Sequence, residues 1–405
     1  MQATKELVLR MGEGPDDPAL WRLCGLPLVL RLALAARRSG IRRVVLTGGD
    51  AVVGRAAELL RADDRLAGSE VREGEGPAHV GPRIEMPANV LVPVEVMRRL
   101  AEAEGDVHLP DVPEVTKRVP GGDGASQPLW QGAAPDRCFA IPVRERRDLA
   151  HAKRILFRHV KSTSSSPIAR WVNERISVHI SKLLVETPIT PNQATVFNTA
   201  LGVAGAVITA FGDVLSLAIG GVLLQATSVL DCCDGEIARC KFMESEYGAW
   251  IDTVGDNVTY AAYALGLTVG YARFAHVQGA PWAPYVAPVG LGALALAMLL
   301  IGGMFHYARA QRLGGSMTAI SKHFEATVDR RGAGVLYKIL DFLKVMGRRA
   351  QFTLAFAVVA VLPLATGSAA FYHGIFFAMI GFVLLANAYF GVGILKARRA
   401  LRARA

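Results

Sequence analysis

Cysteine is scarce in this chain of 405 residues, and its five cysteines follow no metal-binding or disulfide spacing. Paired CxxC zinc motifs and the disulfide framework of a small secreted protein are therefore excluded. The first 14 residues carry several charges and lack an apolar core, so we expect no cleavable signal peptide. Acidic residues are also fewer than basic ones, 35 against 45, which leaves a net charge of +10.

Charged residues are sparse in long stretches after residue 190, whereas the first 165 residues are mixed. With 52% hydrophobic residues and a mean hydropathy of +0.30, the chain is too apolar for an ordinary soluble enzyme. Basic residues lie beside the apolar stretches, where the positive-inside rule and anionic lipids account for them. We therefore expect a membrane protein of two or three domains, with membrane lipids and no nucleic acid among its partners.

Six apolar stretches are long enough, or nearly so, to cross a bilayer as helices, the fifth being short. The predicted fold is an α-helical membrane protein with six transmembrane helices, preceded by an interfacial amphipathic helix and a soluble α/β domain. The membrane domain would cover residues 190–400. The expected spans are Pro191–Ala210, Leu215 into the stretch at Asp231, Gly248–Tyr271, Tyr285–Tyr307, Phe352–Leu364 and Phe371–Leu395.

The distribution of basic residues predicts the orientation of these spans. Arginine and lysine are concentrated between residues 309 and 350 and again after residue 395. The loop at 272–284, by contrast, holds only Arg273 and His276 as basic residues. Because basic loops stay in the cytoplasm, we expect a multi-pass protein of the cell membrane (inner or plasma membrane) whose N-terminal domain and C-terminus are cytoplasmic.

Residues 161–189 are the expected linker between the two domains. Within the linker, Ile168–Leu184 has apolar residues at helical spacing with basic residues between them. This pattern favours an amphipathic helix in the membrane interface, and the alternative is a soluble helix packed on the first domain. The following Thr190-Pro191-Asn192 is typical of a helix start with proline in the first turn.

Residues 1–160 alternate short β-branched runs with helical stretches, an order that predicts a cytoplasmic α/β domain with a parallel sheet. The expected strands are Arg43–Thr47, Asn89–Val92 and Phe139–Val143. The expected helices are Pro27–Ser39, Ala51–Arg61, Val94–Glu104 and Arg147–His159.

Four carboxylates lie where the second and third apolar stretches meet. Asp231 and Asp234 are three residues apart, and Asp252 and Asp256 are four apart, so each pair shares one face of its helix. Burying four acids so close together is prohibitive unless cations neutralise them. Carboxylate oxygens suit Mg²⁺ or Mn²⁺. The residues alone thus predict a divalent metal site at a membrane surface that handles phosphate.

The spacing Asp-x2-Asp-Gly-x2-Ala-Arg-x8-Gly-x3-Asp-x3-Asp also resembles that of the CDP-alcohol phosphotransferases. The eight matching positions are Asp231, Asp234, Gly235, Ala238, Arg239, Gly248, Asp252 and Asp256. The resemblance implies a transferase of phospholipid biosynthesis, in which an acceptor hydroxyl attacks the β-phosphorus of a CDP-linked donor and CMP leaves. It also implies a homodimer.

The resemblance gives these positions roles. Asp231, Asp234 and Asp252 would hold Mg²⁺ or Mn²⁺, and Asp256 would be a further ligand or the general base. Arg239 would pair with a donor phosphate. The residues expected to contact the CDP group are Asn192, Asp231, Gly235, Ala238, Arg239 and Gly248.

Basic residues after the fourth span are candidates for binding the acceptor. An arginine cluster near the metal would suit an acceptor that carries a phosphate, such as inositol 1-phosphate. Membrane anchoring by the positive-inside rule is the alternative. The candidates are His306, Arg309 and Arg312 at helical spacing, and Lys322, Arg348 and Arg349, which could converge there.

The stretch from Cys24-Gly-Leu-Pro-Leu to the Thr-Gly-Gly ending at residue 49 resembles part of a sugar-nucleotidyltransferase domain. Such a domain should open with a basic, glycine-rich loop, but Met11-Gly-Glu-Gly-Pro-Asp-Asp is acidic and poorly suited to cradle phosphates. Asp106 and Asp111 are weak metal-ligand candidates. We expect a degenerate, structural or regulatory domain, and the alternative is an active cytidylyltransferase in a bifunctional enzyme.

The two domains together resemble enzymes that join inositol phosphate to CDP-inositol, so the donor would be CDP-inositol or CDP-diacylglycerol. Two other classes of function stay open. A divalent-cation transporter could use the four aspartates for conduction, although Gly235, Ala238 and Arg239 would have no purpose there. A membrane-anchored scaffold would leave the buried acids unexplained.

Overall fold

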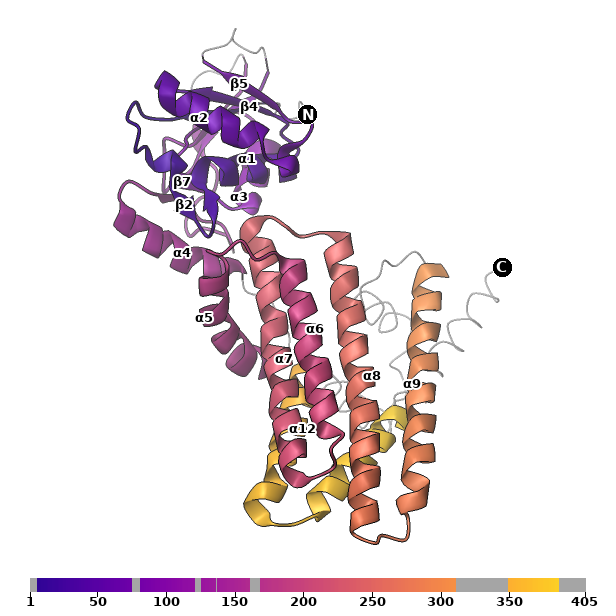
Figure 1. The fold of residues 1–405 in the computed structure, drawn as a ribbon. Coiled ribbons are helices and arrows are strands. Elements are labelled where there is room, and N and C mark those ends of the chain that lie inside the picture. Colours follow the sequence, from indigo (N-terminus) through magenta and orange to yellow (C-terminus); the bar gives the residue numbers. More distant parts are fainter. Residues whose placement is uncertain are drawn as a thin grey trace, which may run out of the picture. The chain divides into compact units, whose positions relative to one another are not determined.

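The computed structural model describes residues 6–74, 81–120, 125–135, 137–160, 168–310 and 349–385 (Figure 1). The chain divides into two compact units. The first contains residues 1–161, 185–188 and 240–242, and the second contains residues 162–184, 189–239 and 243–405.

The first unit is built on a seven-stranded mixed sheet with the order β10-β8-β9-β6-β1-β4-β5. Strands β6, β1, β4 and β5 are parallel, whereas β9 runs antiparallel to both of its neighbours. The strands are β1 Glu6–Arg10, β4 Arg43–Thr47, β5 Glu70–Glu73, β6 Arg83–Pro87, β8 Val107–His108, β9 Thr116–Arg118 and β10 Gln127–Pro128.

Buried side chains on alternate positions hold the centre of this sheet together. Leu7 and Leu9 of β1 are opposite Val44 and Leu46 of β4, and all four are almost completely buried. The helices are α1 Leu28–Arg38, α2 Asp50–Arg61, α3 Val94–Glu102 and α4 Arg146–Val160. All four predicted helices are confirmed, with ends that shift by one or two residues.

Two of the three predicted strands are shorter than predicted and lie outside the main sheet. Arg43–Thr47 is confirmed as β4, but the sheet strand near Asn89–Val92 is β6, Arg83–Pro87. Residues Val90–Leu91 (β7) instead pair with Ile141–Pro142 (β11) in a separate two-stranded sheet. The same pairing shortens the strand expected at Phe139–Val143. The expectation of a parallel sheet fails at β9, which returns antiparallel.

Arg31 is a buried charge inside the first unit, with 3% of its surface exposed. Its Nε donates to the carbonyl of Leu23 (2.9 Å), in the short strand β2 (Arg22–Leu23) that pairs with β3 (Leu26–Pro27). Its Nη2 donates to the carbonyl of Cys240 (2.7 Å). A buried guanidinium is tolerated when such acceptors surround it, so Arg31 joins residue 240 to the first unit.

The second unit is helical in its described residues. Helices α6, α7, α8 and α9 are drawn as long rods in Figure 1, and α6 with α8 and α8 with α9 are in contact. The helical segments are η3 Ala169–Asn173, α5 Glu174–Leu184, α6 Pro191–Thr209, α7 Val214–Lys241, α8 Glu246–Val277, α9 Ala283–Ala310, α12 Arg349–Thr366 and a last helix, Ala370–Leu385.

Among the described residues, three helical stretches are long and apolar enough to cross a membrane: Val214–Lys241, Ala283–Gly303 and Arg349–Thr366. Ala370–Leu385 is apolar but shorter. The expected sixth span ran on to Leu395, and its last ten residues lie outside the described part of the chain. The first predicted span starts where the sequence indicated, because Thr190 and Gln193 form a capping box.

Helices α6 and α8 approach each other backbone to backbone. A Cβ atom at Gly266 or Gly270 of α8 would overlap the carbonyl oxygens of Ala206 or Thr209 on α6. Small residues allow this close contact, which is typical of helices packed in lipid. The α6–α8 pair is therefore tightly packed. The first turns of the two helices lie at the same end of the pair, where an added Cβ at Gly248 would come 3.2 Å from Oδ1 of Asn192.

The helix formed by η3 and α5 is apolar outside and polar inside. Trp171 and Leu183 are 64% and 74% exposed, whereas Glu174, Ser177 and Ser181 are buried. The polar face contacts α7, since Ser177 Oγ donates to Glu236 Oε1 (3.0 Å). This segment belongs to the second unit, which disfavours the alternative of a soluble helix packed on the first domain.

Candidate active site

The first half of the acidic motif lies near the end of α7. The carboxylate of Asp234 is buried and accepts a hydrogen bond from Thr195 Oγ1 of α6 (2.6 Å). It also accepts one from the backbone N–H of Gly235 (2.5 Å). Asp231, one turn earlier, is half-buried. The three-residue spacing thus places both acids at the side of α7 that faces the start of α6 and α8.

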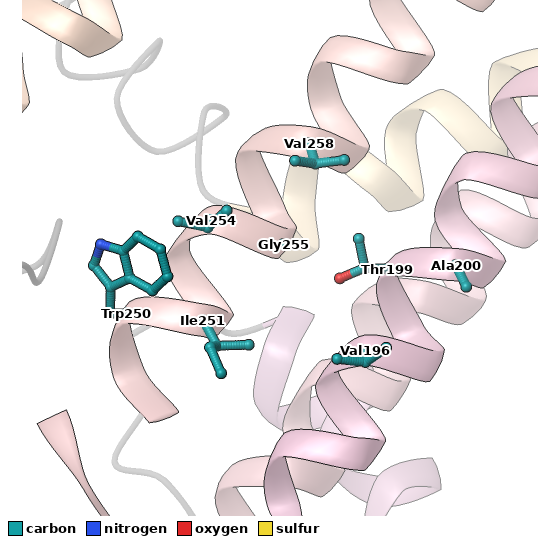
Figure 2. Close-up of a pocket in the computed structure, with 8 residues that line it drawn as sticks. All are labelled: Val196, Thr199, Ala200, Trp250, Ile251, Val254, Gly255 and Val258. Carbon is teal, nitrogen blue, oxygen red and sulfur yellow. The ribbon is translucent and has the colours of Figure 1, made fainter. Parts of the chain in front are cut away.

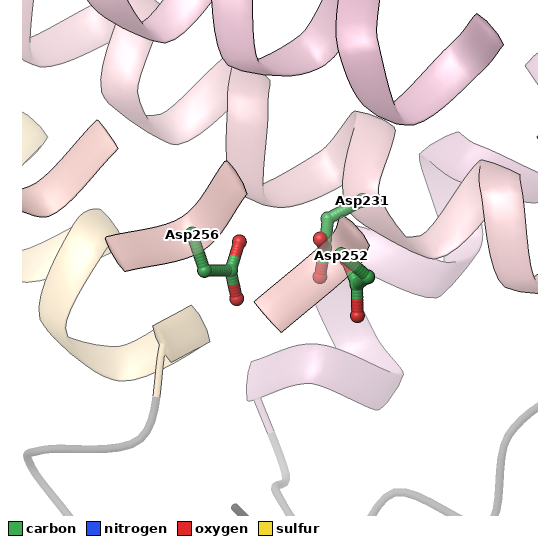
Figure 3. A group of neighbouring side chains, drawn as sticks. All are labelled: Asp231, Asp252 and Asp256. Atoms are coloured by element: carbon green, nitrogen blue, oxygen red, sulfur yellow. The ribbon is translucent and has the colours of Figure 1, made fainter. Parts of the chain in front are cut away.

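The second half of the motif is in the first turns of α8. Ser245 caps this helix by accepting from the N–H of Gly248 (3.0 Å), and Asp252 and Asp256 follow on one face. Carboxylate oxygens of Asp231, Asp252 and Asp256 lie within 4.8 Å of one another (Figure 3). We call these three residues the acidic cluster.

The acidic cluster suits a hard divalent cation. Its ligand atoms are all carboxylate oxygens, the donors that Mg²⁺ and Mn²⁺ prefer. In addition, Asp252 Oδ1 is buried with no hydrogen-bond partner among the described residues. A buried, unpartnered carboxylate oxygen is costly without a cation. Asp234 lies outside the cluster, because its oxygens are taken by Thr195 and Gly235.

Arg349, which the sequence suggested only as a basic residue near the acceptor, lies among the acids of this site. Nη1 of Arg349, the first residue of α12, donates to Asp231 Oδ1 (2.6 Å) and to Asp256 Oδ1. Nη2 is 3.4 Å from the carbonyl of Thr227. The sequence grouped Arg349 with Lys322 and Arg348 near the acceptor, but no spacing rule connects it with acids about a hundred residues earlier.

Residues predicted to bind the CDP group lie on both sides of these acids. At Gly235, an added Cβ would come 3.1 Å from Nη1 of Arg239, so the guanidinium lies against the glycine. At Gly248, an added Cβ would come 3.2 Å from Oδ1 of Asn192. The structure therefore brings Gly235 next to Arg239 and Gly248 next to Asn192. Ala238 is partly exposed on α7.

The family comparison agrees with this geometry. Residues 188–386 match the family model described as CDP-alcohol phosphatidyltransferase. The chain carries a CDP-alcohol phosphotransferase domain. It includes every aspartate of the acidic cluster, together with Arg349.

Similar full-length proteins share one name, bifunctional IPC transferase and DIPP synthase. The Thermococcus kodakarensis protein is 40% identical over 177 residues, which are 42% of this chain and 39% of that protein. The Aquifex aeolicus protein is 36% identical over 132 residues, 32% of this chain and 30% of that protein. The chain thus spans between 30% and 39% of the length of these curated relatives.

Some of the residues predicted to bind the acceptor lie in the part of the chain that the structure describes, and others do not. His306 is exposed on α9, and Arg309 lies in the same helix. Arg312, Lys322 and Arg348 lie outside the described residues.

An apolar groove of about 350 Å³ lies between α6 and α8 (Figure 2). Its walls include Val196 and Ala200 of α6 and Trp250, Val254 and Val258 of α8. The lining is mostly apolar, with the Thr199 hydroxyl and the Trp250 indole N–H as its polar side-chain groups and no charged side chain, so the groove suits an apolar chain. Asp252 and Asp256 stand two residues before Val254 and Val258, or about 200° around the helix, so the acids lie on a different face of α8.

In the first unit, the acidic loop after β1 is closed by its own side chain. Asp17 accepts from the N–H of Gly12 (2.5 Å) and from the N–H of Ala19 (2.7 Å). Gly48 and Gly49, after β4, pack closely against the backbone of Met11 and Glu13. The N–H groups of Met11, Gly12 and Gly49 thus have partners within this region, and the Asp17 carboxylate adds negative charge that disfavours a phosphate there.

The two weak metal-ligand candidates of the first unit do not form a site. Asp106 accepts from the N–H of Val119 (2.7 Å) and pairs with Arg118 (3.4 Å). Among the described residues, the group of acids close enough to share a metal is the acidic cluster of the second unit. Asp106 therefore ties the turn after β9 to the sheet.

Proposed function

We propose that this chain is an integral-membrane CDP-alcohol phosphotransferase. It moves a phosphoalcohol group from a CDP-linked donor to an acceptor hydroxyl and releases CMP. The observation that carries this proposal is the convergence of Asp231, Asp252 and Asp256 from two helices, within 4.8 Å, in a domain of this family.

In this proposal Asp231, Asp252 and Asp256 hold Mg²⁺ or Mn²⁺, and Asp234 completes the set once a substrate is bound. The bound ion stabilises the negative charge on the donor phosphates. Arg239, seated against Gly235, pairs with a donor phosphate, and Asn192, Gly248 and Ala238 face the nucleotide. These residues orient the donor so that its β-phosphorus faces the acceptor.

The transfer exchanges one oxygen for another at phosphorus. Asp256 takes the proton from the acceptor hydroxyl. The hydroxyl oxygen forms a bond to the β-phosphorus, and the bond from that phosphorus to the bridging oxygen breaks. The bridging oxygen keeps the electron pair and leaves as part of CMP.

The proposed acceptor is inositol 1-phosphate and the proposed donor is CDP-inositol or CDP-diacylglycerol. Supporting a phosphorylated acceptor, the chain has basic residues from the last turn of α9 onward, which include Arg309, Arg312, Lys322 and Arg348. The apolar groove between α6 and α8 supports a donor with acyl chains. From the relatives' name we carry over the transferase activity alone, because the closed Asp17 loop supports a degenerate first unit.

The proposed setting is the cell membrane, inner or plasma, crossed by six helices, with the N-terminal domain and the C-terminus cytoplasmic. Exposed Trp171, Ile176 and Leu183, with Arg175 stacked on Trp171 (4.9 Å), support an interfacial position for η3 and α5. The proposed assembly is a homodimer.

The test is CMP release by the purified protein with Mg²⁺. CDP-inositol or CDP-diacylglycerol would be supplied with inositol, inositol 1-phosphate or glycerol 3-phosphate, and Asp256→Asn would run alongside. Acceptor-dependent CMP release that the variant loses is the expected result. No release across the panel, with no binding of CDP, would overturn the proposal and return attention to transport or scaffolding. Against transport, a guanidinium in the site would repel a conducted cation.

A further inference from the structure

Arg349 occupies the place where a metal ion would bind. Its Nη1 contacts one oxygen of Asp231 (2.6 Å) and one of Asp256, and these two residues supply two of the three ligands of the acidic cluster. A divalent cation held by the same carboxylates would lie about 2.0–2.1 Å from their oxygens. The guanidinium and the ion therefore compete for the same space.

The guanidinium of Arg349 meets the charge and the hydrogen-bonding needs of the acidic cluster only in part. It adds one positive charge among three carboxylates, and it leaves Asp252 Oδ1 buried without a partner in the described part of the chain. Its own Nε is also buried, with no hydrogen-bond partner among the residues described. A divalent ion would supply twice the charge and could reach all three carboxylates, so it is the better counter-ion for these acids.

The backbone next to Arg349 is held in place. Thr353, one turn along α12, donates from Oγ1 to Gln225 Oε1 (2.7 Å). Gln225 Nε2 in turn donates to Asn173 Oδ1 (2.9 Å), and Asn173 Nδ2 donates to Ser228 Oγ (2.9 Å). This chain of hydrogen bonds fixes α12 against α7 and η3. Arg349 can thus leave the acids by rotating its side chain, without movement of the helix.

We infer that Arg349 is an internal counter-cation, which neutralises Asp231 and Asp256 in the metal-free protein and has to withdraw before a divalent cation can bind. The inference rests on the metal site of the proposed function. It gives Arg349 two positions, one on the carboxylates and one away from them. The apparent metal affinity is then the intrinsic affinity multiplied by the fraction of molecules in which the arginine is away from the acids.

Mn²⁺ binding to the purified full chain, measured by electron paramagnetic resonance of free Mn²⁺, tests this inference without any turnover. Arg349→Met should bind Mn²⁺ about tenfold more tightly than the wild type, as expected if the arginine occupies the acids about nine-tenths of the time. Arg349→Lys, which keeps one positive charge but loses the fork of donors, should fall between them.

The matched control is Arg273→Met, also in the second unit. Arg273 lies near the far end of α8, where its Nη1 donates to the carbonyl of Ala210 (3.0 Å). This variant should bind Mn²⁺ like the wild type. A second measurement is melting in EDTA, where Arg349→Met should unfold at a lower temperature than the wild type and recover with Mg²⁺.

Each other outcome contradicts the inference in a different way. Equal or weaker Mn²⁺ binding by Arg349→Met, with clear binding by the wild type, would overturn the competition and leave the metal site intact. If neither protein binds Mn²⁺, the metal site fails, and the inference fails with it. Unchanged melting of Arg349→Met in EDTA would show that the arginine does not neutralise the acids.

Discussion

The acidic residues compared in the two units differ in whether their carboxylate oxygens have hydrogen-bond partners within the protein. In the first unit, Asp17 has both carboxylate oxygens occupied by N–H groups of its own loop. In the second, Oδ1 of the half-buried Asp252 is an oxygen that no described group satisfies, and its neighbours Asp231 and Asp256 share a single guanidinium nitrogen. The carboxylate of Asp17 thus has its hydrogen-bond partners without a ligand, whereas the acidic cluster does not.

Whether the oxygens of a carboxylate already have hydrogen-bond partners distinguishes structural acids from functional ones better than the number of acids in a segment does. Met11–Asp17 contains two glycines and three acids. Asp17 nevertheless accepts from the N–H of Gly12, and Asp106 likewise accepts from the N–H of Val119. Buried polar groups in folded proteins are nearly always paired, so an unpaired one indicates a partner that binds from outside. The predictions below follow from this comparison.

The largest effect is expected from Asp252→Asn. The amide keeps the shape but removes a charged ligand from the acidic cluster, so CMP release should fall by about 10³-fold, the scale of losing a group that stabilises transition-state charge. Asp17→Asn, the matched change in the first unit, should alter CMP release less than about twofold. Both variants would be assayed with saturating Mg²⁺. A similar loss in both would break the comparison.

A smaller effect is expected at Thr195, whose hydroxyl donates to Asp234 (2.6 Å). Thr195→Val keeps the shape but removes this donor. Because such supporting hydrogen bonds orient a carboxylate, CMP release should fall by about 10–100-fold. Thr195→Ser should restore most of the rate, which a packing role for the methyl group would not predict. Rates of all three proteins, measured at several Mg²⁺ concentrations, provide the check.

A local effect on stability is expected from Asp17→Ala. Losing the cap of the short helix η1 (Pro18–Leu20) and the bond to Gly12 should cost about 1 kcal/mol. Amide hydrogen exchange of residues 11–19 should become faster, while CMP release stays unchanged. Unaltered exchange there would mean that Asp17 does not hold this loop closed.

The smallest effect is expected from adding CTP. With the donors of the β1 loop occupied, CTP should give no protection from hydrogen exchange in residues 6–160. CDP with Mg²⁺ should protect residues 231–256. Protection of residues 11–19 by CTP would instead support the alternative of an active cytidylyltransferase.

Much of the site could be predicted because it depends on local spacing. Asp231 with Asp234, and Asp252 with Asp256, are one helical turn apart, so any helix places each pair on one face. The start of α6 was equally local, since Thr190, Pro191 and Gln193 form the cap by themselves. Spacing did not reveal that Asp234 would turn to Thr195, and so stand outside the group formed by the other three acids.

The features that were missed depend on contacts between distant residues. Arg349 meets Asp256 only because α12 packs beside α7 and α8. Strand β6 was missed for a related reason. Its sequence, Arg-Ile-Glu-Met-Pro, has two charged residues, and its buried Ile84 and Met86 become visible as core residues only once β1 lies beside them.

The close contact of α6 and α8 at Gly266 and Gly270 has a consequence for genetics. Gly266 is ten residues from Asp256, or about 15 Å along the helix. A larger residue at either glycine would force the helices apart, and the separation between Thr195 on α6 and the acids on α8 would change with them. Temperature-sensitive alleles of this gene should therefore collect at glycines that touch no substrate, well away from the aspartates whose spacing they maintain.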